Sequence, residues 1–285
     1  MRRLGTFLIS VAGATLLAST AALATPTQNV AGVTVPVGSD FITETDYETL
    51  ISGPSSNFMG IGVVTGISDG GTTTTYGFGG VNPPPYLYDE FSGFTVDNIQ
   101  NNADGSLDIF LKGGQLSYYS FGSNQQNSLL SSATAGAAVS AVEAGSLWLS
   151  LTPQAINNAG DTVDLHVPSG NLANVGNSSA YAYLDVSTGA GAGPANSFFN
   201  TCSIPDSSAT GAGCPVGETD FSFNGGANNS DVAGAFPVSG TGSLKTVSST
   251  PVVVAEPLTI SLFGAGLIGI AAFRRRKTVK AVKTA

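Results

Sequence analysis

The sequence predicts an all-β protein, an antiparallel β-sandwich or jelly-roll-like body that lies between two targeting segments. Short runs alternate apolar and polar side chains and are rich in β-branched and aromatic residues. Clusters of Gly, Asn and Asp separate these runs and are typical of turns. Apolar segments with nearby arginines occur at both ends of the chain, so the β-rich body is expected to span residues 25–250.

Residues 1–24 have the layout of a signal peptide. A start that contains two arginines is followed by a mostly apolar stretch over residues 7–18, and Ala22 and Ala24 form a small-x-small cleavage site. The mature chain is therefore expected to begin at Thr25. This layout predicts export by the general secretory route.

The expected strands follow one another at short intervals through the body. They are residues 61–67, 91–96, 106–111, 115–121, 146–151, 162–167, 181–186 and 220–223. The separators interpreted as turns are 103–105, 112–114, 157–161 and 168–171. Strands repeated this often are typical of a sandwich or jelly roll, and one domain is expected. Residues 125–145 are the exception, because alanines and spaced apolar residues predict a helix on one face of the sheet.

The charge of the body limits its partners. All nineteen Asp and Glu residues lie between Asp40 and Glu256, whereas the only basic residues in the body are Lys112 and Lys245. Binding to nucleic acids or to anionic membrane surfaces is disfavoured, because it requires clustered Lys and Arg. Cations and neutral polymers suit this composition better.

The two cysteines agree with an oxidising compartment. Cys202 and Cys214 flank a turn-rich loop, and a disulfide between them would stabilise the fold by about 3 kcal/mol through chain entropy. Metal binding by the two thiols is the weaker alternative.

The body offers no convincing catalytic arrangement, and we expect no enzymatic activity. His166 is the only histidine, and it alternates with apolar residues in a strand, so it is expected to face solvent beside Asp164. Asp89 and Glu90 lie among aromatic residues, as sugar-binding carboxylates do. Adjacent strand residues point to opposite faces, however, so this pair would flank one glycosidic bond only if it lay on a loop.

Residues 97–108 contain oxygen ligands in an arrangement that partly resembles a calcium loop. Asp97, Asn102, Asp104 and Asp108 surround Gly105, but the terminal bidentate Glu and the spacing of an EF-hand are missing. A hairpin turn at residues 103–105 is the favoured interpretation. We therefore expect no cofactor, with calcium kept as the one candidate ligand.

Residues 258–273 form an uncharged apolar run that ends at the basic residues 274–277. The run contains GAGLIG (264–269), which has the glycine spacing of a dinucleotide-binding loop, but no acidic residue and no second strand can follow it. A helix of this length would span about 24 Å, so we expect a marginal single transmembrane helix. The basic stop places the tail 278–285 in the cytoplasm and the body outside.

The C-terminal segment 251–277 resembles the PEP-CTERM sorting signal of Gram-negative bacteria, although alanine occupies the usual position of the first proline. The resemblance rests on Ala255, Glu256, Pro257, Arg274, Arg275 and Arg276. It implies processing by exosortase, a membrane cysteine protease that acts on surface proteins in strains that make exopolysaccharide. Within the body, residues 145–153, 181–200 and 218–223 are similar to flocculation-associated PEP-CTERM proteins.

The resulting expectation is an exported protein, anchored in the inner membrane as a precursor and located in its mature form at the cell surface or in the extracellular matrix. Its expected role is structural or adhesive, in an exopolysaccharide matrix, biofilm or flocculation. The first alternative is a carbohydrate- or calcium-binding module, and the second is a secreted glycoside hydrolase. A carbohydrate module would need an aromatic face, for which the available residues are Tyr86, Tyr88, Tyr118, Tyr119 and Trp148.

Overall fold

The structure, a computed structural model, describes residues 27–69, 74–77, 85–172, 177–188, 192–206, 213–229 and 235–248. The predicted signal peptide (1–24) and sorting signal (251–277), including the predicted helix 258–273, lie outside these ranges. So do Ala22, Ala24, Ala255, Glu256, Pro257, Arg274, Arg275 and Arg276. Within the described ranges, no helix has the length and apolar character needed to cross a membrane.

The described chain is mostly antiparallel β-structure, which confirms the predicted all-β class. The longer strands are β3 (Ser39–Glu48), β4 (Asn57–Ser68), β6 (Tyr86–Asn101), β7 (Leu107–Phe121), β8 (Ser146–Pro153), β10 (Ser179–Val186), β13 (Phe221–Asn229) and β14 (Val238–Val247). The shorter strands are β1 (Thr27–Val30), β2 (Val33–Pro36), β5 (Thr74–Gly77), β9 (Val163–Val167), β11 (Ile204–Pro205) and β12 (Glu218–Thr219). The helices are α1 (Gln126–Leu130), α2 (Ala135–Glu143) and α3 (Asn196–Phe199).

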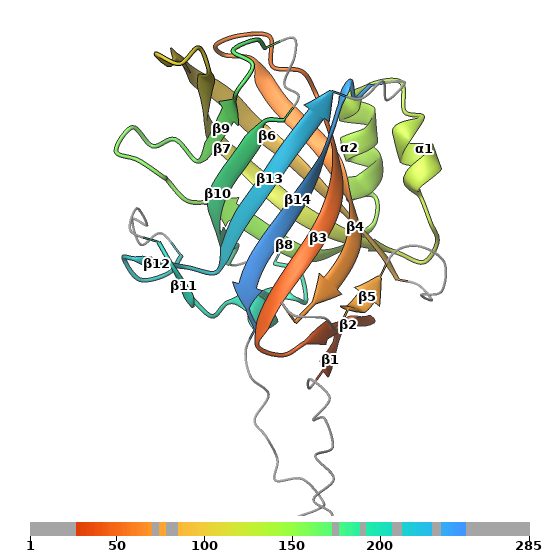
Figure 1. The fold of residues 1–285 in the computed structure, drawn as a ribbon. Helices are drawn as coiled ribbons and strands as arrows, with labels where there is room; N and C mark the ends of the chain where they lie inside the picture. The colour runs from red at the N-terminus through yellow and green to blue at the C-terminus, as the bar shows by residue number, and fades with distance from the viewer. Residues whose placement is uncertain are drawn as a thin grey trace, which may run out of the picture.

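The main sheet closes on itself and is barrel-like (Figure 1). Its strands follow the order β13-β14-β3-β4-β6-β7-β8-β10, and β10 pairs again with β13. Like β8, strand β9 pairs with both β7 and β10. The structure therefore corrects the expected sandwich of two packed sheets. Both architectures need the same alternation along each strand, and only the pairing of β10 with β13 distinguishes them.

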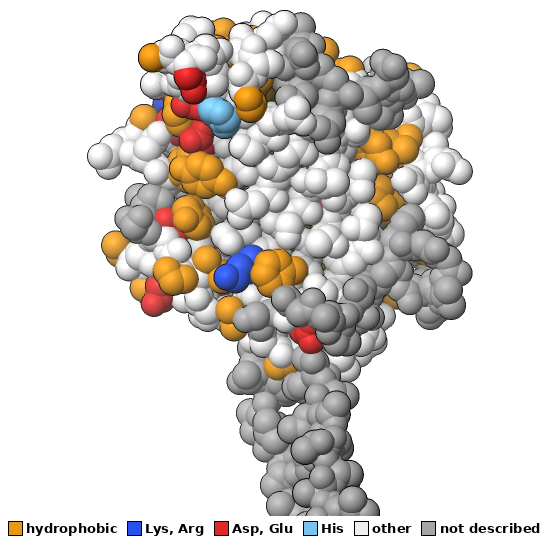
Figure 2. Space-filling view, in the orientation of Figure 1, with side chains coloured by type: hydrophobic (Ala, Val, Ile, Leu, Met, Phe, Trp, Pro, Cys, Tyr) orange, Lys and Arg blue, Asp and Glu red, His pale blue; other side chains and the backbone are white. Residues whose placement is uncertain are grey.

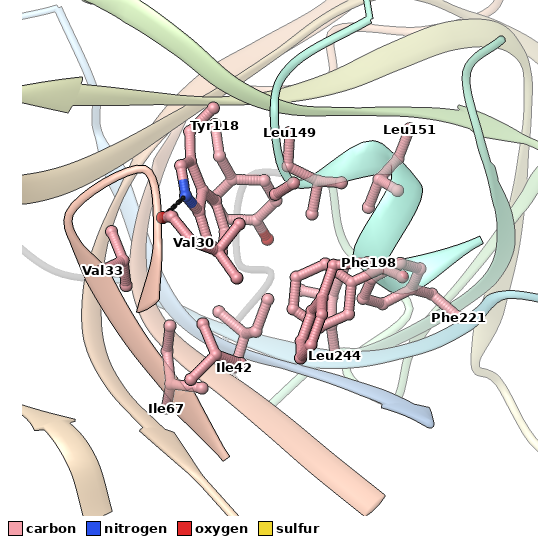
Figure 3. Packing of buried hydrophobic residues seen from close by; sticks show 14 of the residues in the cluster. Val30, Val33, Ile42, Ile67, Tyr118, Leu149, Leu151, Phe198, Phe221 and Leu244 are labelled. Carbon is pink, nitrogen blue, oxygen red and sulfur yellow. Dashed lines mark hydrogen bonds between the residues drawn. The ribbon is translucent and has the colours of Figure 1, made fainter. Parts of the chain in front are cut away.

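Large apolar side chains pack together inside the closed sheet (Figure 3). Ile42, Leu149, Leu184, Phe221 and Leu244 belong to this core and are at most 2% exposed. The β1–β2 hairpin closes the same end of the sheet. There the Trp148 indole N–H donates a hydrogen bond of 2.9 Å to the backbone oxygen of Val30.

The helix predicted within residues 125–145 is confirmed as the pair α1 and α2. Thr134 begins α2 because its hydroxyl accepts a hydrogen bond from the Ala137 N–H. Val139 and Val142 of α2 are buried against the outer side of the sheet, in a cluster that includes Ile61. Helix α2 thus covers the outside of β4 and β6 (Figure 1).

The described chain enters and leaves at the same end of the closed sheet. The Ser248 N–H donates to the Gly38 oxygen at 2.7 Å, and the Gly38 N–H donates to the Ser248 hydroxyl at 2.8 Å. Strand β1 and the end of β14 both lie at this end (Figure 1). We call it the terminal pole. The opposite end, where β3 finishes at Glu48, is the distal pole.

Candidate functional site

Strand β3 directs carboxyl groups into the closed sheet. Its alternate residues Asp40, Ile42, Glu44, Asp46 and Glu48 share one side of the strand, which is the inner side because Ile42 belongs to the core. Glu44 and Asp46 are 3% and 4% exposed. A strand with alternating acids ordinarily turns them towards water, so this inward orientation marks β3 as exceptional.

Glycines on the neighbouring strands make room for these carboxyls. Asp46 lies between Gly240 of β14 and Gly62 of β4, and Gly62 in turn pairs with Asp89 of β6. A Cβ atom at Gly62 would collide with the Asp89 carboxylate. At Gly242 it would lie 2.5 Å from Glu44 Oε1. Any side chain at Gly62 or Gly242 would therefore fill the space that the carboxylates occupy.

Glu44, Asp46 and Asp89 form a cluster, which we call the acidic cluster. One carboxylate oxygen from each residue lies within 4.8 Å of the other two, and all three residues are buried. The Tyr118 hydroxyl of β7 donates to Glu44 Oε2 at 2.8 Å. In contrast, Asp46 Oδ1 and both oxygens of Asp89 have no hydrogen-bond partner among the described residues.

Burial raises the pKa of all three clustered carboxyls well above their ordinary values, and the charges of neighbouring acids raise it further. The hydrogen bond from Tyr118 acts in the opposite direction on the Glu44 pKa. Burial also raises the pKa of Glu48 to about 7. Three ionised carboxylates held this closely would be strongly unfavourable without a counter-charge. The acidic cluster must therefore hold protons or a cation.

A cavity of about 80 Å³ adjoins the acidic cluster on the side of the distal pole. Glu44, Asp46 and Glu48 form part of its wall, and the rest is apolar, with Phe58 and Phe91 among the lining residues. No basic side chain lines it within the described ranges. The volume is sufficient for several water molecules, so the cavity can hold a hydrated ion.

The structure does not gather the four residues considered for calcium into a cation site. Asn102 and Asp104 lie in the β6–β7 turn, where Asp104 Oδ1 accepts from the Ser106 N–H at 3.0 Å. Asp108 Oδ1 lies 2.7 Å from His166 Nδ1, and Asp97 pairs with Lys112 Nζ at 2.9 Å. The hairpin turn favoured from the sequence is therefore present, and its side chains stabilise the turn.

The remaining candidates for catalysis are not assembled into a catalytic site. His166 lies on the outer side of β9 and is 43% exposed in its side chain. Asp89 points inward, whereas the neighbouring Glu90 lies on the outer side of β6. Burial raises the Glu90 pKa. These two carboxyls therefore do not face one another, as the alternation of a strand requires.

Most of the aromatic residues considered for sugar binding are buried. Tyr88 and Tyr118 are 0% exposed, and Trp148 is 1% exposed. Tyr86 and Tyr119 pack against the cluster beneath α2. The sequence left the position of Trp148 open, and the structure places it in the core. These five residues do not form an aromatic binding face.

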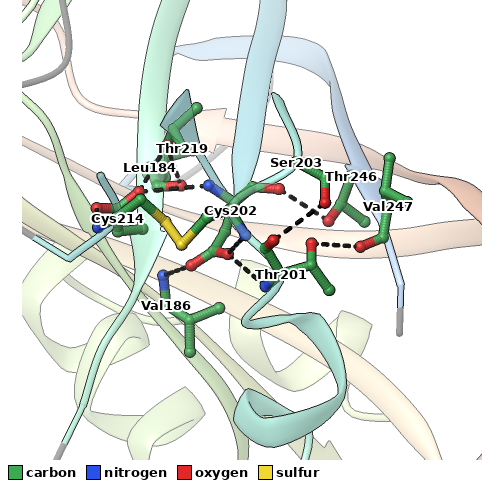
Figure 4. The surroundings of a disulfide bond; sticks show 11 residues. Leu184, Val186, Thr201, Cys202, Ser203, Cys214, Thr219, Thr246 and Val247 are labelled. Atoms are coloured by element: carbon green, nitrogen blue, oxygen red, sulfur yellow. Dashed lines mark hydrogen bonds between the residues drawn. A yellow bond between two sulfur atoms is a disulfide. The ribbon is translucent and has the colours of Figure 1, made fainter. Parts of the chain in front are cut away.

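Cys202 and Cys214 form a disulfide in the structure, with their Cα atoms 5.3 Å apart (Figure 4). Asp220 holds the first cysteine, because its carboxylate accepts the N–H groups of Thr201 and Cys202, both at 2.7 Å. Asp185 holds the second, because it accepts the Cys214 N–H at 2.9 Å. The two sulfur atoms are bonded to each other, so this group serves as a structural clamp and not as a thiolate metal site.

Sequence reasoning did not identify β3 or the acidic cluster. The signal is present as Glu44-x-Asp46-x-Glu48, acids at the period of a strand, but such a pattern is normally assigned to a solvent-facing side. Comparisons with protein families, with curated proteins and with solved structures find no match for this chain.

Proposed function

We propose that the protein is an exported cell-surface or extracellular-matrix protein with a structural or adhesive, non-enzymatic role in an exopolysaccharide matrix, as in biofilm or flocculation. The observation that carries this proposal is a polar, nearly uncharged outer face on three adjacent strands. We call it the β3–β14–β13 face. It consists of Thr43, Thr45, Ser222, Asn224, Ser239, Thr241 and Ser243, and the charged residue described on the same side is Lys245, which pairs with Ser222.

The pairing of these strands aligns the side chains of the β3–β14–β13 face in rows. Ser243 of β14 pairs with Thr43 on one side and with Asn224 on the other. Thr241 pairs with Thr45 in the next row. Figure 2 shows a largely white area over these strands, in which few hydrophobic or charged side chains appear. Hydroxyl and amide groups in rows suit hydrogen bonding to a neutral, hydroxyl-rich polymer.

The terminal pole supports display of the body from a membrane. Both ends of the described chain leave at this pole, and the sequence that follows Ser248 soon reaches the sorting motif at Glu256 and Pro257. A body joined to the membrane in this way would direct its distal pole outward. The proposed partners are an exosortase-type enzyme during processing, the inner membrane before processing, and exopolysaccharide afterwards.

Binding to the matrix polysaccharide tests the adhesive role. We expect Thr241→Glu to weaken cosedimentation of the exported chain with polysaccharide purified from the producing strain by about tenfold, because a charged, bulkier side chain interrupts the row of hydrogen bonds. The matched control is Ser140→Glu, which adds the same charge to an exposed position on α2. Equal binding by wild type and Thr241→Glu would contradict this assignment of the face. Unchanged cell aggregation after deletion of the gene would contradict the adhesive role itself.

Processing by exosortase predicts a defined C-terminus. Mass spectrometry of the mature protein recovered from the cell surface or medium is expected to find an end near Glu256 and Pro257. The physical reason is that the basic stop would hold the predicted helix in the membrane and leave this motif at its outer boundary. Recovery of mature chains that still carry peptides from Arg274 onward would instead show a permanent anchor.

A further inference from the structure

We propose that Glu44, Asp46 and Asp89 bind a hard divalent cation, calcium in the extracellular setting, inside the closed sheet. The proposed site rests on the geometry of the acidic cluster and of the adjoining cavity. It does not depend on the polysaccharide-binding role proposed above. It also involves different residues from the Asp97–Asp108 segment.

The position of Asp89 is the first reason. Asp89 belongs to β6, two strands away from β3, yet its carboxylate lies over Gly62 and faces the acids of β3. It is 0% exposed, and neither of its oxygens has a hydrogen-bond partner among the described residues. Buried carboxylates are almost always paired or bound to metal. No described donor group reaches either oxygen, and only a proton shared with Glu44 competes with a cation for them.

The chemical nature of the ligands selects the kind of cation. The acidic cluster offers carboxylate oxygens, with no nitrogen or sulfur ligand in the group. Calcium and magnesium prefer such ligands, whereas zinc and copper favour imidazole and thiolate. Calcium also accepts irregular coordination by six to eight oxygens. Three carboxylates and water from the cavity beside Glu44 and Asp46 can supply that number.

The surroundings of the acidic cluster hold its ligands in position. Tyr118 donates to Glu44 Oε2 and so fixes the orientation of that carboxylate, as an outer partner of a metal ligand does. Gly62 and Gly242 allow the carboxylates to approach from neighbouring strands. A cation would also provide the positive charge that no basic side chain on the described cavity wall provides.

Terbium luminescence tests the site directly, because Tb³⁺ replaces calcium at oxygen sites and is excited by a nearby tyrosine. We expect the exported chain, freed of metal by a chelator, to show tyrosine-sensitised emission that added Ca²⁺ displaces. Asp89→Asn is expected to weaken both Tb³⁺ and Ca²⁺ binding at least tenfold. Tyr118→Phe is expected to lose most of the sensitised emission while Ca²⁺ binding, measured by calorimetry, changes less.

The matched control is Asp104→Asn, which removes a carboxylate from the exposed β6–β7 turn and is expected to leave binding unchanged. Calcium should also release protons on binding at mildly acidic pH, since Glu44, Asp46 and Glu48 line the cavity, Asp89 lies beside the first two, and Tyr118 donates to Glu44. Wild-type protein without calorimetric Ca²⁺ binding would overturn the proposal whatever the variants do. Binding retained in folded Asp89→Asn, or lost in Asp104→Asn, would place the cation elsewhere.

Discussion

In the presence of a chelator, the free energy of unfolding of the body is expected to fall as the pH rises from about 5 to about 8. Asp40, Glu44, Asp46, Glu48 and Asp89 all have folded-state pKa values above their ordinary ones, with burial as the main cause. The folded protein therefore keeps protons that the unfolded chain has released. Their contribution to stability is complete below the unfolded pKa values and is lost as the pH passes the folded ones.

Two of these groups define the expected pH window. Burial raises the pKa of Asp40 from 3.8 to about 7, and that of Glu48 from 4.5 to about 7. The loss of stability should begin near the unfolded pKa values of these two groups. It should continue beyond neutral pH, because the pKa values of the three carboxyls of the acidic cluster are raised as well. Each proton held only by the folded state contributes a slope of about 1.4 kcal/mol per pH unit.

Urea denaturation at a series of pH values measures this effect. Asp46→Asn is expected to reduce the slope by the contribution of one proton, about 1.4 kcal/mol per pH unit, because the amide is neutral at every pH in this range. Asp104→Asn is the control, since hydrogen bonds from Ser106 lower the pKa of this exposed carboxyl and its contribution to stability therefore stays constant between pH 5 and pH 8. A stability that stays level or rises between pH 5 and pH 8 would contradict the proposed state of the buried acids.

The fold class follows from local patterns, whereas the closure of the sheet does not. The alternation in residues 162–167 and 181–186 suffices to predict β9 and β10. Closure depends on the pairing of Leu184 with Phe221 and of their neighbours along β10 and β13. No local pattern in either strand specifies its partner, and the same inward side chains would fill a sandwich.

The interpretation of residues 112–114 as a turn was wrong for a specific physical reason. Gly113 and Gly114 both have positive φ, at 70° and 89°, but they bend a continuous β7 instead of ending it. Gly93 on the paired strand β6 also has positive φ, at 75°, so the two strands bend together. Glycine allows both a turn and a bend within a strand, and the sequence does not distinguish them.

The acidic cluster was missed because its residues are far apart in the chain and because the pattern of β3 is ambiguous. Alternating acids and polar or aromatic residues leave the inner face of a strand undefined unless its neighbours are known. Here Tyr47 is covered from outside, in the cluster beneath α2, and the glycines opposite Glu44 and Asp46 create the inner space. The inward orientation is thus a property of three paired strands.

Replacing Asp220 with alanine is expected to lower the free energy of unfolding by roughly 3–9 kcal/mol, a large part of the stability of a typical domain. Asp220 is 1% exposed, and besides Thr201 and Cys202 it accepts the Val186 N–H at 2.8 Å. Alanine would leave three backbone donors without an acceptor. Each buried donor left unsatisfied costs about 1–3 kcal/mol.

A graded series separates this effect from simple loss of volume. Asp220→Asn keeps the shape of the side chain but places an amide N–H₂ group against at least one N–H donor. Its free energy of unfolding is therefore expected to lie between those of the wild type and Asp220→Ala. Asp164→Ala is the control, because this carboxyl on the outer side of β9 receives no N–H bond comparable to those on Asp220. Urea denaturation in oxidising buffer gives the free energies. Equal stability of Asp220→Ala and Asp164→Ala would contradict the argument.

Hydrogen exchange identifies the backbone amides that lose protection when the Asp220 carboxylate is removed. In the wild type, the amide protons of Val186, Thr201 and Cys202 are expected to be protected by the carboxylate, and in Asp220→Ala they should exchange much faster. The disulfide would still join Cys202 to Cys214, but the first cysteine would no longer be held against β13. Its sulfur should then become easier to reduce than in wild type, measured as faster thiol labelling under mild reductant. Unchanged protection of these amides together with unchanged reduction would show that the disulfide alone holds the loop.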